Sequence, residues 1–575
     1  MMRSGLGLVT TAALCAGPLA AQGADPALLR RVDSVFAPWS GTASPGCAVG
    51  VDRAGRPLFR RAYGMANLES GTPWTVATLS ESGSVAKQFV ASSLVLLARD
   101  GVLSLDDDIA RWIPEVRGFG RKITIRHLLT HTSGIPDRYT LHEMQGRPAG
   151  ETDHENAEVL DLVAHLRELN FDPGEDYLYS NTGYIIAAAI VERASGKSLE
   201  AFTDARIFKP LGMNNTRWRE DHRVVVPGRA AAYSGTMIRG FRNDPPFTRV
   251  IGSGGLLTTV DDFLKWQDAL LAGGDPWGAV RDSLERVGRL NDGTELGYGL
   301  GVGVDSWRGV RRVSHTGSTG GYRAALARFP EQQTAVALLC NLGSIEPGGV
   351  AQRVAAIVLG DVLAAVEPEP QAVAMDSAAL AALSGAYFSP RTEEALVLEV
   401  RKGQLVDSTE DGAALIPIAP GRFKYRGSRR TITVVEGREY AATHGRGGDG
   451  KSDGRKDTRT DRGDAKVLRL EAPNARAVEY VAVPRPRPDA RTLAGYAGQY
   501  RSPELDVAYR LAVRGDTLQM LRGWRPPLAL RALFRDGFVA GDAGSIRFLR
   551  DARGRVTGFV LYAGRVRHLH FERTA

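Results

Sequence analysis

The pattern of apolar and polar positions divides the chain into a mixed region and a strand-rich region. Strand-like runs at 47–52 and 57–63 come first, and helical patterns follow at 84–100, 156–168 and 184–194. Strand-like runs return at 310–314, 322–329 and 334–339. Strands at both ends with helices between them predict an α/β domain over 25–365, whose sheet takes strands from both ends of the segment.

Beyond residue 365 the pattern changes. The linker Glu-Pro-Glu-Pro at 367–370 is followed by strand-like periodicity to the end of the chain. The stretch 383–390 is echoed at 496–503, and alternating strands follow each copy. We therefore predict two small antiparallel β-barrels, over 376–485 and 490–575. The segment 445–466 is rich in Gly, Asp and basic residues and is expected to be a disordered loop of the first barrel.

The first 23 residues are typical of a signal peptide. Arg3 precedes a small, apolar stretch at 5–19, and small residues follow at 20–23. This stretch is short for a membrane span, and no second one follows. We expect a periplasmic or secreted protein without a membrane span after cleavage.

Composition and charge exclude some classes of function. The chain of 575 residues is 43% hydrophobic and 24% charged, with a formal net charge of +8. Basic and acidic residues are interspersed, so nucleic-acid binding has little support. Cleavage would leave Cys47 and Cys340, too few for a disulfide scaffold or a zinc cluster. Both lie in apolar runs, which favours two buried thiols.

Three short motifs carry the candidate chemistry. Ser84 and Lys87 are spaced to share a helix face, so an amine could accept the proton of a serine hydroxyl. Tyr179-Ser-Asn181 and His315-Thr-Gly317 follow, the last of them at the end of a predicted strand. In this order the motifs resemble those of the serine β-lactamase and penicillin-binding protein family, class C branch, which includes D-aminopeptidases and esterases.

The resemblance spans about 30–365 and extends to three flanking blocks, at 125–134, 208–213 and 252–262. It implies a β-lactamase/transpeptidase-like catalytic domain, an antiparallel sheet with helices. The two following barrels, of lipocalin-like type, resemble the D-aminopeptidase arrangement. In that fold the first strand lies antiparallel to the last, which could bring Cys47 and Cys340 close enough for a disulfide.

The resemblance also implies roles for the residues. Ser84 would be the nucleophile, and Lys87 and Tyr179 would share the proton transfers. Tyrosine becomes a base only if cations lower its pKa from about 10, so the choice between the two stays open. Substrate contacts would come from Asn181, His315, Gly317 and Ser318, and the backbone N–H groups of Ser84 and Ser318 would form the oxyanion hole. No cofactor or metal is implied.

His315 departs from the lysine that β-lactamases carry at this position. Because histidine is mostly neutral above pH 7, this favours an esterase or a D-amino-acid peptidase acting on a small ester, amide or peptide. The alternatives are a weak β-lactamase, or a non-catalytic envelope-binding or sensor module with a vestigial site.

Weaker candidates have simpler explanations. His127 and His131 could be metal ligands on one helix face, but no His-Glu-x-x-His pattern supports this. Tyr177 is an alternative base that lacks an Asn two residues later. The Gly-rich run at 252–255 is better explained as a tight turn than as a phosphate loop.

Overall fold

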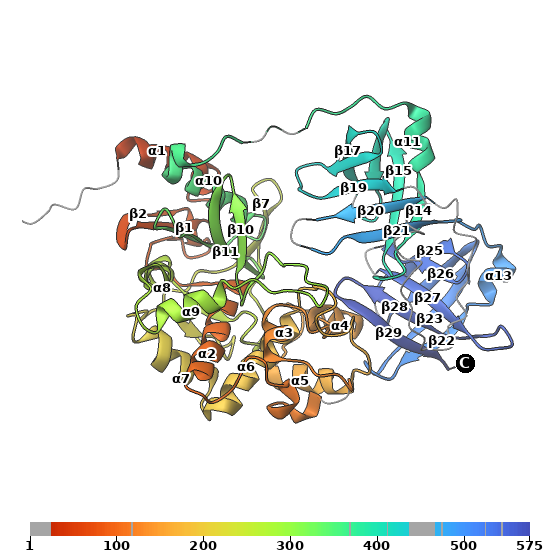
Figure 1. Ribbon diagram of the computed structural model, residues 1–575, viewed down its shortest axis with the longest axis horizontal. Helices are drawn as coiled ribbons and strands as arrows, with labels where there is room; N and C mark the ends of the chain where they lie inside the picture. Colours follow the sequence, from red (N-terminus) through yellow and green to blue (C-terminus); the bar gives the residue numbers. More distant parts are fainter. Residues whose placement is uncertain are drawn as a thin grey trace, which may run out of the picture.

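The computed structural model describes residues 25–574, apart from 117–118, 367, 369, 411, 436–465, 473–474, 524 and 542–543. The predicted signal peptide and all but the last residue of the predicted loop 445–466 lie outside the described residues. An α/β domain is followed by two closed barrels (Figure 1). Within the described part of the chain, none of the helices combines the length and the apolar character that crossing a membrane requires.

The α/β domain is built on a six-stranded antiparallel sheet in which the first two strands lie beside the last one. Its order is β10 (Gly303–Trp307), β11 (Val310–Thr319), β12 (Tyr322–Phe329), β13 (Thr334–Cys340), β1 (Cys47–Arg53) and β2 (Arg56–Tyr63). The prediction that both ends of the segment build one sheet is confirmed.

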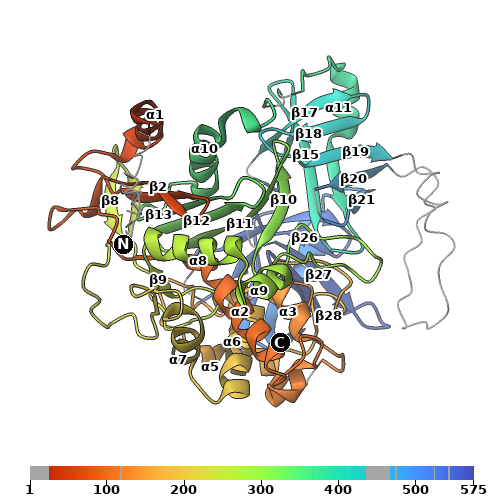
Figure 2. The same cartoon turned by 60° about the vertical axis from the view of Figure 1, so that its left-hand side comes forward.

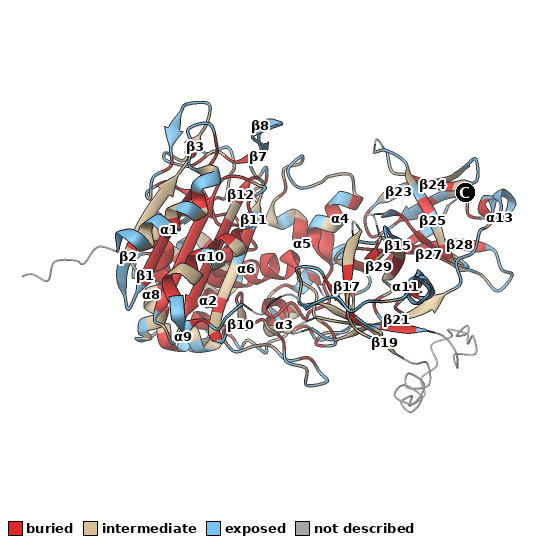
Figure 3. Ribbon diagram, turned by 90° about the horizontal axis from the view of Figure 1, so that it is seen from above, coloured by how far each residue is buried: buried red, intermediate tan, exposed pale blue. Residues whose placement is uncertain are grey.

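Helices cover both faces of this sheet (Figures 2 and 3). On one face Ala48, Ala337 and Leu339 pack in a core with α2 (Lys87–Arg99), α6 (Asn181–Ser195) and α8 (Val260–Ala272). On the other, Val49 and Leu338 pack with α1 (Pro26–Phe36) and α10 (Pro347–Leu359). Both faces are buried, so β1 and β13 read as continuous apolar runs rather than alternating ones.

Short helices and short strands complete the α/β domain. The helices are α3 (Ile125–Leu129), α4 (Arg138–Met144), α5 (Asn156–His165), α7 (Leu199–Thr203) and α9 (Trp277–Leu284). The strands are β3 (Met65–Asn67), β4 (Thr72–Pro73), β5 (Ser80–Glu81), β6 (Arg217–Trp218), β7 (Tyr233–Thr236), β8 (Gly240–Asn243) and β9 (Leu256–Thr258). The helix expected at 156–168 ends at His165, because the backbone of Leu166 adopts an extended conformation.

Cys47 and Cys340 form a disulfide between β1 and β13. The two residues are directly opposite in the antiparallel register, and both are fully buried. The expectation of two free thiols, drawn from the local apolar pattern, is wrong. Strand pairing, which that pattern does not reveal, decides the outcome.

We expect the double variant Cys47→Ala/Cys340→Ala to lose about 2–4 kcal/mol of unfolding free energy, because the bridge joins segments far apart in the chain. Urea unfolding of the oxidised protein and of the variant measures this. Two free thiols in the unreduced, denatured wild-type protein would contradict the bridge.

Two closed eight-stranded antiparallel barrels follow the α/β domain, which confirms the predicted fold class. The first contains β14 (Gly385–Phe388), β15 (Ala395–Arg401), β16 (Gln404–Asp407), β17 (Ala413–Ala419), β18 (Arg422–Tyr425), β19 (Thr431–Val435), β20 (Val467–Glu471) and β21 (Val478–Val483). The second contains β22 (Gly498–Ser502), β23 (Val507–Arg514), β24 (Thr517–Leu521), β25 (Leu528–Phe534), β26 (Gly537–Val539), β27 (Ser545–Arg550), β28 (Val556–Ala563) and β29 (Val566–Arg573).

The sequence echo marks the same position in each barrel. A short helix, α11 (Ser377–Leu383) or α13 (Ala490–Ala494), leads into the first strand. The tyrosine of that strand then closes a hydrogen bond onto the carbonyl four residues earlier. Tyr387 Oη donates to Leu383 O at 2.9 Å, and Tyr500 Oη donates to Tyr496 O at 2.8 Å.

Candidate active site

Ser84 and Lys87 lie where a short helical turn passes into α2. Ser84 is in the 3₁₀ turn Gly83–Ala86, and Lys87 is the first residue of the α-helix. The helix is buried along most of its length, so it fixes the pair against the core. Lys87 Nζ lies 3.1 Å from Ser84 Oγ, and the side chain of Lys87 is fully buried while Ser84 is half-buried.

The contacts of Lys87 suit a neutral amine. Besides Ser84, Nζ donates to Asn181 Oδ1 at 2.9 Å and to Ser253 O at 2.8 Å. A neutral amine has two N–H donors for these two acceptors, and its lone pair is then left to face the Ser84 hydroxyl. Burial lowers the pKa of Lys87 well below its usual range, and Arg565 and Arg138 add to this against the opposing charge of Asp137.

Asn181 begins α6 and is held by a carboxylate that the sequence reading missed. Asp137 Oδ2 accepts from Asn181 N at 2.6 Å and from Asn181 Nδ2 at 3.0 Å. These bonds orient the amide so that Oδ1 faces Lys87. Both ends of the Asn181 amide are therefore engaged within the protein. Asp137 also caps α4, accepting from Tyr139 N, so one carboxylate ties two helix starts to the site.

Tyr179 lies beside the pair within an aromatic cluster. Lys87 Nζ is 4.9 Å from the centroid of its ring, and the His131 ring is 4.1 Å away, centroid to centroid. Burial raises the pKa of Tyr179 above its usual value, and a hydrogen bond with Ser84 opposes this only in part. Burial thus outweighs the lowering of the Tyr179 pKa by the Arg565 charge. Tyr177 is also buried, with a pKa raised to about 12.

The backbone of the third motif packs directly against the backbone of the turn that carries Ser84. Gly83 has a φ of +50°, and a Cβ there would lie 2.6 Å from Ser318 N. A Cβ on Gly317 would lie 1.9 Å from Ser82 O and 3.0 Å from Ser84 N. Only glycines allow this approach. It brings the backbones of Ser84 and Ser318 side by side, as an oxyanion hole formed by their N–H groups requires.

His315 lies on β11 and is held as a neutral ring. Its Nδ1 is 2.6 Å from Thr316 O, which fixes the proton on Nδ1. Nε2 then accepts from Tyr298 Oη at 3.0 Å. Burial and the Lys87 charge lower the pKa of His315 to about 4. His315 thus supplies no positive charge at neutral pH. Tyr298 was not singled out from the sequence.

Both barrels contact the segment that carries Tyr179. Asp176, three residues earlier, pairs with Arg391 of the first barrel at 2.7 Å and with Arg567 of the second at 3.3 Å. Arg567 also reaches Glu394 of the first barrel at 3.2 Å. Asp176 and Arg567 are largely buried, while Arg391 and Glu394 are partly exposed. The network joins the three domains beside the site.

The second barrel also reaches the site directly. Arg565, in the turn between β28 and β29, places its guanidinium carbon 4.9 Å from the centroid of the Tyr179 ring. Sequence reasoning missed it, because no motif marks a lone arginine in a hairpin turn of a separate domain.

The weaker sequence candidates take other places. Helix α3 ends at Leu129 and His131 has a φ of +59°, so His127 and His131 do not share a helix face. His127 caps α3, and His131 Nδ1 accepts from Ser180 N at 3.1 Å. Within the described residues no cluster of three or more His, Cys, Asp or Glu side chains could hold a metal. The Gly-rich run at 252–255 supplies Ser253 O to Lys87.

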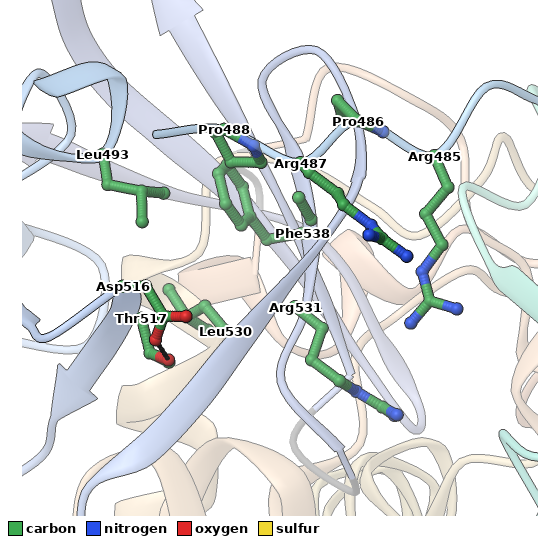
Figure 4. Close-up of a pocket in the computed structure, with 11 residues that line it drawn as sticks. Arg485, Pro486, Arg487, Pro488, Leu493, Asp516, Thr517, Leu530, Arg531 and Phe538 are labelled. Carbon is green, nitrogen blue, oxygen red and sulfur yellow. Dashed lines mark hydrogen bonds between the residues drawn. The ribbon is translucent and has the colours of Figure 1, made fainter. Parts of the chain in front are cut away.

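A separate pocket of about 580 Å³ opens on the second barrel and its linker (Figure 4). Arg485, Arg487 and Arg531 line it, and none of the three motifs does.

The comparison with protein families decides the assignment. The family model described as Beta-lactamase matches residues 32–359, more than half of the chain and all three motifs. The chain belongs to the β-lactamase family. The resemblance drawn from the motifs is confirmed, and as a member of this family the protein is a serine hydrolase.

Relatives with several activities share this family. The D-aminopeptidase of Brucella anthropi is 25% identical over 547 residues, covering 92% of this chain and 95% of that protein. Penicillin-binding protein 4* of Bacillus subtilis is 31% identical over 304 residues, covering 49% of this chain and 65% of that protein. Esterase EstB of Burkholderia gladioli is 38% identical over 192 residues, covering 31% of this chain and 48% of that protein.

A solved structure supports the fold. The octameric penicillin-binding protein homologue from Pyrococcus abyssi superposes with a TM-score of 0.52 at 22% identity, covering 79% of this chain and 98% of that one.

Proposed function

We propose that this β-lactamase-family hydrolase cleaves small esters or D-amino-acid amides and peptides through an acyl-enzyme on Ser84. The observation that carries the proposal is the position of the Lys87 amine, which lies 3.1 Å from Ser84 Oγ. Its two other hydrogen-bond partners, Asn181 Oδ1 and Ser253 O, both accept from it. This arrangement suits a base that removes the serine proton.

In the proposed first step Ser84 Oγ attacks the substrate carbonyl carbon and its proton passes to Lys87 Nζ. The carbonyl oxygen becomes an oxyanion, which the backbone N–H groups of Ser84 and Ser318 stabilise; such a donor contributes about 10²- to 10³-fold in rate. Tyr179, whose raised pKa keeps it protonated, relays the proton from Lys87 Nζ to the leaving alcohol or amine as the bond to the carbonyl carbon breaks, which returns Lys87 to its neutral form. Water then attacks the acyl ester, with Lys87 again as base.

The proposed substrate class follows from the site and the relatives. His315 is neutral, so the third motif lacks the cation that β-lactamases carry there. D-aminopeptidases and an esterase are among the relatives, and the D-aminopeptidase match extends through both barrels.

A panel of p-nitrophenyl esters, D-alanine p-nitroanilide and nitrocefin tests the class. We expect the ester or the D-alanine anilide to be turned over with a higher kcat/KM than the β-lactam. A folded protein that hydrolyses none of them would favour the alternative of a binding or sensor module. Nitrocefin as the best substrate would favour a β-lactamase.

The proposed base sets the sign of the pH dependence. Lys87 has a lowered pKa and acts only when neutral, so kcat/KM should fall as the pH drops through the Lys87 pKa, and this fall should lie well below the pH at which an ordinary lysine titrates. A pH profile with a neutral ester measures the acid limb. A rate that keeps rising toward about pH 10, the usual lysine value, would contradict a buried neutral amine.

We also propose export, on the signal-peptide pattern of residues 1–23 and the Cys47–Cys340 bridge, which suits an oxidising compartment. N-terminal sequencing of protein from the periplasmic or secreted fraction should find a start near residue 24. An uncleaved protein confined to the cytosol would contradict it.

A further inference from the structure

The turn that carries Arg565 is fixed against the catalytic domain through its backbone. Arg565 O accepts from Asp137 N at 3.2 Å and from Asn170 Nδ2 at 3.0 Å, and Arg567 N donates to Asn170 Oδ1 at 2.6 Å. The backbone is therefore held at Arg565 and at Arg567. The Arg565 side chain is 43% exposed, and its Nη1 lies 3.8 Å from Asp137 Oδ2. A guanidinium is thus presented beside Tyr179 with one long ion pair, to an Asp137 oxygen that already accepts two hydrogen bonds from Asn181.

A second cation, Arg138, follows Asp137 in the chain. Arg138 is only 1% exposed, and its Nε and Nη1 are buried without a hydrogen-bond partner. Among the described residues no carboxylate forms an ion pair with it; its guanidinium rests on the Tyr139 ring, 4.1 Å from the centroid. A buried guanidinium without a partner is costly. It is retained here next to the candidate catalytic residues.

The charges around Lys87 do not balance. Asp137 is the one acid that acts on Lys87, while Arg138 and Arg565 are two cations that do. The neighbouring rings add no charge at neutral pH, since His131 and His315 are held neutral. With Lys87 itself neutral, the described site carries one uncompensated positive charge. When Lys87 takes the serine proton, the oxyanion formed in the same step balances the new ammonium charge, so the excess stays at one.

We propose that Arg565, supported by the nearby charge of Arg138, binds a carboxylate of the substrate, so that the enzyme prefers esters or amides that carry a free carboxylate. A guanidinium matches a carboxylate in shape and charge. The second barrel thereby supplies the cation for a substrate carboxylate that the third motif lacks. This inference rests on the proposed function, because the carboxylate belongs to the molecule that Ser84 would attack.

Matched substrates test the preference. Two pairs of esters are compared, in which a carboxylate or its methyl ester stands on the leaving group in one pair and on the acyl group in the other. We expect one pair to favour the acid, and the ratio of kcat/KM between acid and methyl ester to fall at least tenfold in Arg565→Gln. Arg565→Lys should keep part of the preference. Arg514→Gln, an exposed arginine on β23 of the same barrel, should keep all of it.

Two outcomes overturn the inference while leaving the proposed function intact. One is hydrolysis of both members of each pair with no preference for the acid. The other is a preference that Arg565→Gln does not change. Failure of the proposed function is a different result, since no ester of either pair would then be hydrolysed.

A binding measurement does not depend on turnover. N-acetyl-D-alanine, titrated calorimetrically into Ser84→Ala, should bind, and adding Arg565→Gln should weaken the binding at least tenfold. Adding Arg138→Met should also weaken it yet raise the melting temperature, because an unpartnered buried charge is removed. A lower melting temperature with unchanged binding would show that Arg138 is structural only, and an absence of binding to Ser84→Ala would overturn the subsite.

Discussion

Ser84→Ala is expected to lower kcat/KM for every ester or amide substrate by at least about 10⁴-fold, because the acyl-enzyme cannot form without the hydroxyl. The fold should be unaffected. Ser84 is half-buried, and its side-chain partners, Lys87 and Tyr179, are each held by other contacts.

Steady-state kinetics with a chromogenic ester measure the loss. Ser93→Ala is the matched control: this buried serine lies on the same helix and donates only to Phe89 O, at 2.8 Å. The control should keep activity and lose about 1 kcal/mol of stability. If Ser84→Ala kept more than about a tenth of the wild-type rate, the nucleophile would be another group.

Lys87→Met should lower kcat/KM about 10²- to 10⁴-fold at neutral pH, since a thioether cannot accept the serine proton. Methionine is similar in length and apolar, so it suits the buried position. It leaves Asn181 Oδ1 and Ser253 O without their donor, which should cost about 1–3 kcal/mol of unfolding free energy.

The kinetic and stability losses of Lys87→Met can be separated. Rates are measured well below the melting temperature of the variant, and circular dichroism confirms that it is folded. Lys209→Met, at an exposed lysine paired with Asp204, is the control and should change neither quantity by much. A Lys87→Met enzyme within tenfold of wild type would reassign the base, with Tyr179 as the next candidate.

Local patterns were sufficient for the fold. Apolar runs marked the strands on both sides of the helical segment, and the repeated Tyr-containing stretch marked the first strand of each barrel. The order and spacing of the three motifs were also sufficient to identify the family resemblance, which implied that Ser84, Lys87, Tyr179 and Asn181 share one site. These features are encoded within short windows, so the sequence alone reveals them.

Local sequence patterns did not reveal features that depend on distant pairings, and only the family resemblance raised the possibility of the Cys47–Cys340 bridge. The Cys47–Cys340 bridge depends on the register of β1 against β13, and Arg565 depends on how the second barrel docks. The direction of the Tyr179 pKa stayed open at the sequence level for a similar reason. The sequence shows the cation Lys87 nearby, but only the structure shows that burial of the phenol outweighs it.

The central claim is that Ser84 is the acylated nucleophile. Labelling of the full protein with a fluorophosphonate probe, followed by peptide mapping, tests it most directly. We expect one label per chain, on Ser84, that is lost in Ser84→Ala and greatly slowed in Lys87→Met. A label on any other residue, or no label on a folded and hydrolytically active enzyme, would contradict the account.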